Sequence, residues 1–160
     1  MIDGINLTEN KIIHHIDGDI LHIIQKSSIG YCGFGEVYAS SIHKDKIKGW
    51  KRHNDITINL TVIIGSIKFA IYDDRVNSKT YKEINTFILG PDLKFSRLTI
   101  ISGLWVAFKG LGENNLLINV IPKEHDKNEA DKRSSAIPLA NFAIEFAVAG
   151  HTTITSADFN

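Results

Sequence analysis

The 160-residue chain has no excess of charge of either sign, because 18 basic side chains are balanced by 18 acidic ones. Binding to duplex nucleic acid needs basic side chains that neutralise a run of phosphates, so the composition argues against such a partner. No apolar run reaches the roughly 18 residues of a membrane span. The first ten residues also lack the basic and apolar regions of a signal peptide. We therefore expect a chain that binds neither nucleic acid nor membrane.

Cysteine is almost absent, since Cys32 is the only one. It has no partner for an internal disulfide, and a lone thiol is typical of a reducing cytoplasm. The length and the 43% apolar content suit one domain with a substantial core. We expect a single cytoplasmic domain over residues 1–160, in which 134–160 is a tail whose structure the sequence does not predict.

Short runs rich in isoleucine and valine fill the chain, separated by turn residues, which is typical of a sandwich or a barrel. The Gly65-Ser66 pair between two such runs indicates a tight hairpin. After it, Ile67, Phe69 and Ile71 alternate with residues that face the other way. The expected strands are Lys11–His15, Leu21–Gln25, Gly35–Ser41, Gly49–His53, Ile56–Ile64, Ser66–Asp73, Thr86–Leu89, Arg97–Ile101, Trp105–Gly110 and Asn115–Val120. The sequence predicts an all-β fold.

One polar stretch, Lys123–Arg133, has a different character. It begins after Pro122 and places Glu129 four residues before Arg133, a spacing that supports helices. We expect one short, solvated polar helix near the C-terminal third of the chain.

The segment Lys48-Gly49-Trp50-Lys51-Arg52-His53, followed by the apolar run 56–65 and by Tyr72-Asp73-Asp74-Arg75, carries the most information. It resembles the central strands of the cupin nucleotide-sugar epimerases, the family of dTDP-4-dehydrorhamnose 3,5-epimerase. That family usually has Arg-Gly-x-His or Lys-Gly-Trp-His-x-His here. Three further blocks, 34–40, 103–108 and 111–114, follow in the family's order, so the resemblance covers roughly residues 17–130. It implies a double-stranded β-helix (a cupin jelly roll) that forms homodimers and holds its active site inside the barrel.

The resemblance also implies a chemistry. In the family a histidine base, hydrogen-bonded to an aspartate, removes a proton beside a 4-keto group, and a tyrosine on the opposite face returns one. Here Lys51 falls on the histidine position and Asn119 falls near the tyrosine position. His53 matches the second histidine of the related 3,4-ketoisomerases (Arg-Gly-x-His-x-His), and Tyr38 resembles a tyrosine from their preceding strand. The expected catalytic residues are His53, Lys51 and Tyr38.

Substrate contacts follow from the resemblance and from strand alternation. Lys48 occupies the family's phosphate-binding arginine position and keeps its charge. Alternation places Glu36 on the face of Tyr38, and it places Asn59 and Thr61 inside the barrel while Ile58 and Leu60 point away. Arg75 fits a ligand contact or a structural salt bridge equally well. The expected substrate-binding residues are Lys48, Glu36, Asn59, Thr61, Arg75, Trp105 and Asn119.

We expect no metal and no other cofactor. Metal-binding cupins use His-x-His and a nearby glutamate, and Lys51 replaces the first histidine of that set. His14 and His15 would point to opposite faces of a strand, so they cannot chelate together.

Three functions stay open at this point. The favoured one is a 3- and/or 5-epimerase of a nucleotide-linked 4-keto-6-deoxy sugar, working in surface polysaccharide biosynthesis. The first alternative is a 3,4-ketoisomerase of a dTDP-keto sugar that uses His53 and Tyr38. The second is a non-catalytic cupin that binds a sugar nucleotide or supports a partner enzyme.

Overall fold

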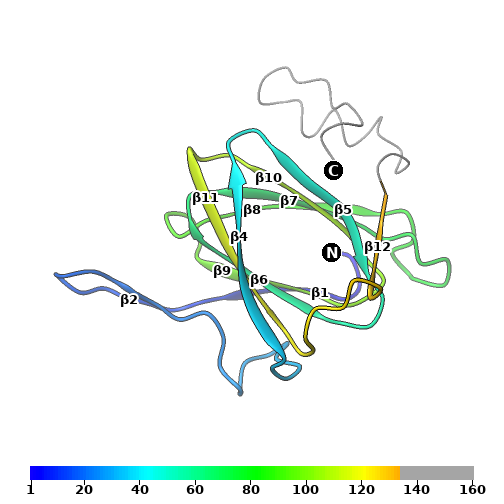
Figure 1. The fold of residues 1–160 in the computed structure, drawn as a ribbon, viewed down its shortest axis with the longest axis horizontal. Helices are drawn as coiled ribbons and strands as arrows, with labels where there is room; N and C mark the ends of the chain where they lie inside the picture. The colour runs from blue at the N-terminus through cyan, green and yellow to red at the C-terminus, as the bar shows by residue number, and fades with distance from the viewer. Residues whose placement is uncertain (134–160) are drawn as a thin grey trace.

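Two antiparallel sheets face each other and form a barrel (Figure 1). The computed structural model describes residues 1–133, and this part contains strands and turns only. It therefore contains no helix long and apolar enough to cross a membrane. One sheet has the order β1 (Ile5–Glu9), β9 (Ser96–Ile100), β6 (Ile58–Ile64), β11 (Asn114–Ile121) and β4 (Glu36–His43). The other has the order β12 (Ala130–Lys132), β5 (Ile47–His53), β10 (Trp105–Gly110), β7 (Ile67–Tyr72) and β8 (Ile84–Leu89).

The all-β prediction is confirmed, and each of the ten expected strands overlaps one of β2 to β11. Two strands were missed. β1 pairs with β9 at the edge of its sheet, with Ile5 opposite Ile100, and β12 pairs with β5. The remaining two-stranded sheet, β2 (Ile12–Ile13) with β3 (Ile20–Leu21), projects from the barrel as a hairpin arm (Figure 1).

The predicted helix at Lys123–Arg133 is wrong. The segment is a loop that ends in β12, and backbone groups at its end bond to β5 and to the residue after it. The amide of Asn54 donates to the carbonyl of Glu129, and the amide of Arg133 donates to the carbonyl of Trp50. A helical charge pair contributes only about 0.2–0.5 kcal/mol, which a paired strand readily outweighs. The predicted tail, 134–160, lies outside the described residues.

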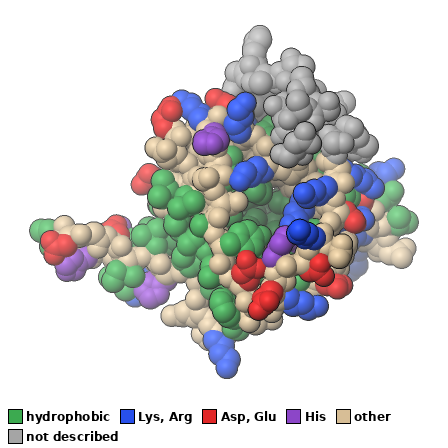
Figure 2. All heavy atoms as spheres, viewed as in Figure 1, with side chains coloured by type: hydrophobic (Ala, Val, Ile, Leu, Met, Phe, Trp, Pro, Cys, Tyr) green, Lys and Arg blue, Asp and Glu red, His purple; other side chains and the backbone are tan. Residues whose placement is uncertain are grey.

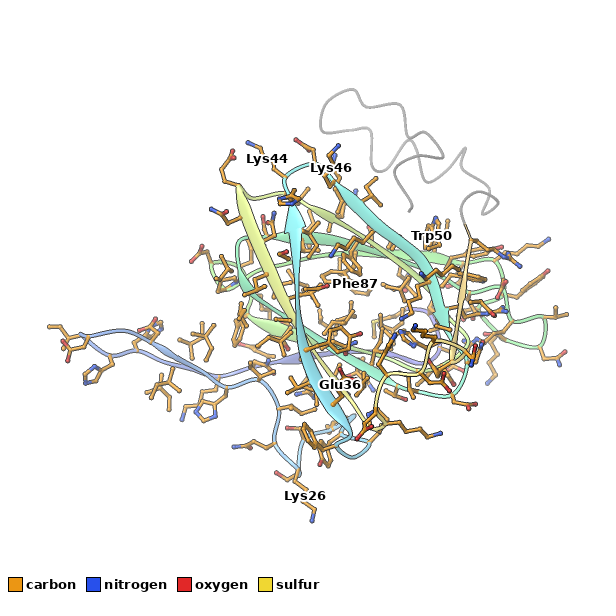
Figure 3. The ribbon with its side chains drawn as sticks, viewed as in Figure 1. Lys26, Glu36, Lys44, Lys46, Trp50 and Phe87 are labelled. Carbon is orange, nitrogen blue, oxygen red and sulfur yellow. The ribbon has the colours of Figure 1, made fainter. Side chains whose placement is uncertain are left out.

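The core lies between the two sheets and is made of aliphatic side chains with a few aromatic rings. Phe69 is fully buried and its ring centroid lies 5.7 Å from that of Phe108. Phe87, inside the barrel in Figure 3, packs against this core. Ile58, Leu60 and Val62 of β6 belong to the core as well. The apolar face of β6 therefore points into the barrel.

The prediction that Asn59 and Thr61 point into the barrel is consequently wrong. They lie on the outer face of their sheet, which the chain between β3 and β4 covers. The Asn59 side-chain amide donates to the carbonyl of Gly30 at 3.1 Å, and buried Arg97 donates to the carbonyl of Ile29 at 2.6 Å. The sequence rule failed because this outer face is also buried, so polar residues there could not be told from residues facing a ligand.

A bulge in β5 sets the orientation of the lysines that matter later. The register of β10 against β5 shifts between Val106 and Phe108. At this point Gly49 has φ +122°, and a Cβ there would lie 2.7 Å from the backbone of Ala107. Only glycine accepts that conformation and that close approach. As a result Lys48 and Lys51, three residues apart, both face the interior.

Candidate active site

A cavity of about 440 Å³ lies between the two sheets. In Figure 2 a hollow opens between β4 and β5, with basic, acidic and histidine side chains near its rim. Its apolar lining comes from Ile58, Leu60, Val106, Phe108 and Leu117. The other lining residues are Glu36, Tyr38, Ser40, Lys48, Gly49, Lys51, His53, Asn119 and His125. Polar groups therefore converge in a largely apolar cavity, which is the usual form of a small-molecule site.

His53 stands at the end of β5 and is held by a glutamate from the loop between β11 and β12. Its Nδ1 lies 2.5 Å from Oε2 of Glu129. The other carboxylate oxygen accepts from the amides of Asn54, Asp55 and Ile56 at 3.0–3.2 Å. An ionised carboxylate only accepts hydrogen bonds, so Nδ1 carries the proton and Nε2 is left with a free lone pair. His53 is thus oriented as a base.

The electrostatic setting keeps both partners in those states. Burial lowers the pKa of His53, with the charge of Lys51 adding to the effect and Glu129 opposing it. Burial acts to raise the pKa of Glu129, but the amide of Asp55 and the side chain of His53 hold it below its ordinary value. At neutral pH the pair is therefore a neutral imidazole beside a carboxylate, ready to accept one proton.

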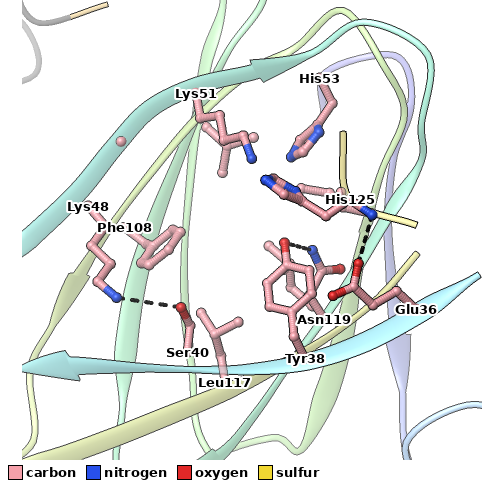
Figure 4. Close-up of a pocket in the computed structure, with 14 residues that line it drawn as sticks. Glu36, Tyr38, Ser40, Lys48, Lys51, His53, Phe108, Leu117, Asn119 and His125 are labelled. Carbon is pink, nitrogen blue, oxygen red and sulfur yellow. Dashed lines mark hydrogen bonds between the residues drawn. The ribbon is translucent and has the colours of Figure 1, made fainter. Parts of the chain in front are cut away.

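Lys51 points into the same part of the cavity (Figure 4). Burial lowers the pKa of its amine, while the charge of Glu129 acts in the opposite direction. A half-buried ammonium near a base can hold the oxygen on which negative charge develops when a neighbouring C–H loses its proton.

Tyr38 faces these groups from β4 in the opposite sheet. Its hydroxyl accepts a hydrogen bond from the side-chain amide of Asn119 at 2.8 Å. The two residues are direct cross-strand neighbours. Burial raises the pKa of Tyr38, Asn119 opposes the rise, and Glu36 adds to it. The phenol thus stays protonated and can donate its hydrogen into the cavity. Asn119 was aligned near the family's tyrosine, so the phenol here comes from the adjacent strand.

Lys48 and Ser40 line another part of the cavity (Figure 4). The Lys48 amine lies 3.5 Å from the serine hydroxyl, a contact long enough to be given up to a ligand. Glu36, Tyr38, Lys48, Lys51, His53 and Asn119 are the predicted site residues that the structure brings together around the cavity.

Four predicted site residues, Asn59, Thr61, Arg75 and Trp105, do not line this cavity. Arg75 binds the fully buried Asp73 carboxylate at 2.8 Å through both Nε and one terminal nitrogen, which is its structural salt bridge. Trp105 packs with Trp50 in a second cluster of buried aromatics and donates its indole N–H to Asp74 at 2.8 Å. Neither residue is placed by the structure at the cavity where a substrate contact was expected: Arg75 lies beyond the end of β7, and Trp105 packs on the outer side of the second sheet.

Sequence reasoning missed Glu129 and His125, since both lie in the segment predicted to be a helix. The amide of His125 donates to the Glu36 carboxylate at 2.8 Å, and this bond attaches the loop to β4. One signal was present: an acid and a histidine close together, just after the last barrel strand that the resemblance covers. No spacing rule connects that acid with His53, which is 76 positions away.

Within residues 1–133, no group of three histidine, cysteine, aspartate or glutamate side chains is arranged to hold a metal ion. The Glu129 carboxylate already accepts from His53 and three amides.

Comparison with known proteins agrees with this fold. No family model matches the chain. A probable low-salt glycan biosynthesis epimerase of Haloferax volcanii is 33% identical over 97 residues, which are 59% of this chain and 62% of that protein. A dTDP sugar isomerase from Desulfovibrio desulfuricans has a TM-score of 0.81 at 28% identity, covering 88% of both chains. The fold is that of the dTDP-sugar epimerases and isomerases.

A 3′-monoepimerase of Streptomyces bikiniensis, solved in complex with dTDP-quinovose, has a TM-score of 0.82. The match covers 98% of this chain and 82% of that protein at 15% identity, so it supports the fold alone. The resemblance seen in the sequence to nucleotide-sugar epimerases and isomerases is confirmed. The sequence match to the curated relative spans less than two thirds of that protein.

Proposed function

We propose that this chain is an epimerase that inverts a carbon beside the keto group of a nucleotide-linked 4-keto-6-deoxy sugar, at C3, C5 or both. The observation that carries the proposal is the opposition of two pairs across one cavity. His53 with Glu129 lies on the side of β5, and Tyr38 with Asn119 lies on the side of β4 and β11. Inversion needs a base on one face of a carbon and an acid on the other, and these pairs supply both.

The chemical step follows from the states of these groups. Nε2 of His53 takes the proton from the carbon next to the carbonyl, and Glu129 stabilises the imidazolium that forms. The electron pair moves into the carbonyl to give an enolate, whose oxygen is held by the Lys51 ammonium. Tyr38 then gives its proton to the opposite face of the same carbon. The substrate gains no net proton, while the enzyme is left with a protonated His53 and a deprotonated Tyr38.

The ketoisomerase alternative moves a proton between neighbouring carbons on one face. It needs acid and base on the same side of the sugar ring, whereas His53 and Tyr38 come from facing sheets. The non-catalytic alternative does not explain why His53 is oriented as a base or why Lys51 is half-buried in the cavity. Epimerisation uses both, so we favour it.

The nucleotide would use the part of the cavity near Lys48 and Ser40. A diphosphate needs a cation, and the resemblance assigns phosphate binding to the position of Lys48. Phe108, beside Lys48 in Figure 4, offers an apolar surface. We also propose, from the resemblance and the lone cysteine, that the enzyme is a cytoplasmic homodimer that works without metal or cofactor. Its pathway would be glycan biosynthesis, the role in the name of the Haloferax relative.

The test is incubation of the protein with dTDP-4-keto-6-deoxyglucose in deuterated water, followed by proton NMR of the C3 and C5 signals. The proposal expects loss of one or both signals and the appearance of a C3 or C5 epimer. A tautomer with the carbonyl at C3 as the product would favour the ketoisomerase. Binding of several dTDP and UDP keto sugars without any exchange would favour the non-catalytic protein.

A further inference from the structure

We propose that His125 is a proton-relay residue, which returns the proton from His53 to Tyr38 after each turnover and connects both with solvent. The inference rests on the proposed function, because it concerns how that site is reset. Inversion with two groups leaves protons on the wrong partners, and the next turnover requires a neutral His53 and a protonated Tyr38.

Neither partner is placed to reset alone. His53 is 8% exposed, and its Nδ1 is engaged by Glu129. Tyr38 is half-buried in the cavity wall, and its oxygen accepts from Asn119. The Lys51 ammonium lies nearby but has only protons to donate, and in the proposed reaction it stays on the substrate oxygen.

His125 has the position that a relay requires. It lies on the loop between β11 and β12, is exposed to solvent, and still lines the cavity. Figure 4 shows its ring between the His53 and Lys51 side and the Tyr38 side. It lies close enough to His53 for the two imidazoles to interact electrostatically. An imidazole accepts a proton on one ring nitrogen and releases one from the other, so it can pass a proton between two groups that do not touch.

The loop holds the ring there through its backbone. The amide of His125 donates to Glu36, and the loop ends at Glu129, which binds three amides after β5. The side chain of His125 takes no part in these bonds. A substitution at this position should therefore leave the loop and the His53–Glu129 pair in place.

The proton balance is complete. Protonated His53 gives its proton to one nitrogen of His125, and the other nitrogen gives a proton to the Tyr38 oxygen. This leaves His125 in its other tautomer, and proton exchange with water at the exposed ring restores the first one. When the two transfers are not simultaneous, water at the exposed ring supplies or takes up the proton. No oxidant, metal or other reactant is needed.

The experiment compares wild-type protein with His125→Ala in steady-state turnover and in a single turnover with enzyme in excess. A relay slows only the reset, so we expect a near-normal single turnover and a steady-state kcat lower by about tenfold or more, within the range of one proton-transfer group. Added imidazole buffer should raise the kcat of His125→Ala in proportion to its concentration and leave the wild type nearly unchanged. His43→Ala, which removes an exposed histidine of β4 away from the cavity, is the matched control and should behave as the wild type.

Two results would overturn the relay. One is an unchanged kcat in His125→Ala. The other is a loss that is equal in single and multiple turnovers and does not respond to imidazole, which would make His125 a substrate contact or a structural residue. Failure of the proposed function looks different, because the wild type itself would then show no exchange with any keto sugar.

Discussion

The charged side chains on the two faces of the second sheet differ in whether the protein itself supplies their partners. On its outer side, Arg52 binds Asp131 at 2.7 Å and Asp74 at 3.3 Å and lies 4.7 Å from the centre of the Trp105 ring. One residue away along β5, on the inner side, Lys51 has a pKa lowered by burial and faces a cavity. The outer charge of Arg52 forms ion pairs with carboxylates of the protein, while the inner lysines keep N–H groups that can bind a ligand. The difference separates charges that hold the fold from charges that await a ligand.

The largest effect on activity is expected when His53, the base on the inner side, is replaced. His53→Asn keeps the size and the polarity of the side chain but removes a group that can accept a proton. We expect deuterium exchange into the sugar to fall by about 10²–10⁴, the usual contribution of a general base. The melting temperature should change little, and measuring both quantities on the same preparation makes the comparison. A variant that exchanges at the wild-type rate would show that the base is elsewhere, with Lys51→Ala as the next variant to examine.

Asp73→Asn tests the matched charges instead. Burial acts to raise the pKa of the fully buried Asp73 carboxyl, but hydrogen bonds from Arg75, Ser78 and Thr80 hold it far below its ordinary range. The substitution should cost about 3 kcal/mol of unfolding free energy, the lower end for a broken buried ion pair, because Arg75 keeps 26% of its side chain exposed.

The pH dependence of stability gives the check on Asp73. With a lowered pKa in the folded state, this carboxylate contributes its full stability above the ordinary aspartate pKa and loses it as the pH falls through the lowered one. Urea denaturation of the wild type and of Asp73→Asn, at pH 7 and in acid, should give curves that approach each other in acid. A gap that stays constant would contradict the ion-pair account.

Lys48→Ala should act on binding rather than on chemistry. Its exposed amine has one long contact in the protein, so a diphosphate is the partner that would use its charge. Loss of one charged hydrogen bond weakens binding by about 1–3 kcal/mol. Calorimetry with dTDP measures it, and Lys44→Ala at the β4–β5 turn, outside the cavity lining, is the control. Equal affinity in Lys48→Ala and the wild type would remove Lys48 from the nucleotide site.

Lys51→Met should slow exchange, because the enolate oxygen loses its cation, but the change that concerns its coupling to His53 is a small one, a shift in the pH profile of the remaining rate. Burial and then the charge of Lys51 lower the pKa of His53, so exchange by the wild type should persist below the ordinary histidine pKa and decline as the pH falls through the lowered value. Removing the positive charge should raise the pKa of His53 and move the acidic limb to higher pH. A limb that stays in place would mean that Lys51 and His53 are not coupled.

Alternation along strands predicted much of this arrangement from sequence. It placed Glu36 with Tyr38 and Lys51 with His53, because each of those strands has one clear side. It failed at β6, where both faces are buried and Ile58 proved to be the inward residue. It could not find Glu129, since a contact across 76 positions depends on where a polar loop returns to β5. Charge pattern alone made that loop look helical.

The central claim is that His53 and Tyr38 act on opposite faces of one carbon. The most direct test follows deuterium during the first few per cent of turnover in deuterated water, by mass spectrometry of the substrate and the product after separation. Two groups on two faces predict deuterium in the product at the inverted carbon and almost none in the recovered substrate. The shielded base returns the proton it took, while the acid is recharged from the exposed His125, whose ring nitrogens exchange with the deuterated water. Equal labelling of the recovered substrate and the product, or a product without deuterium, would contradict the account.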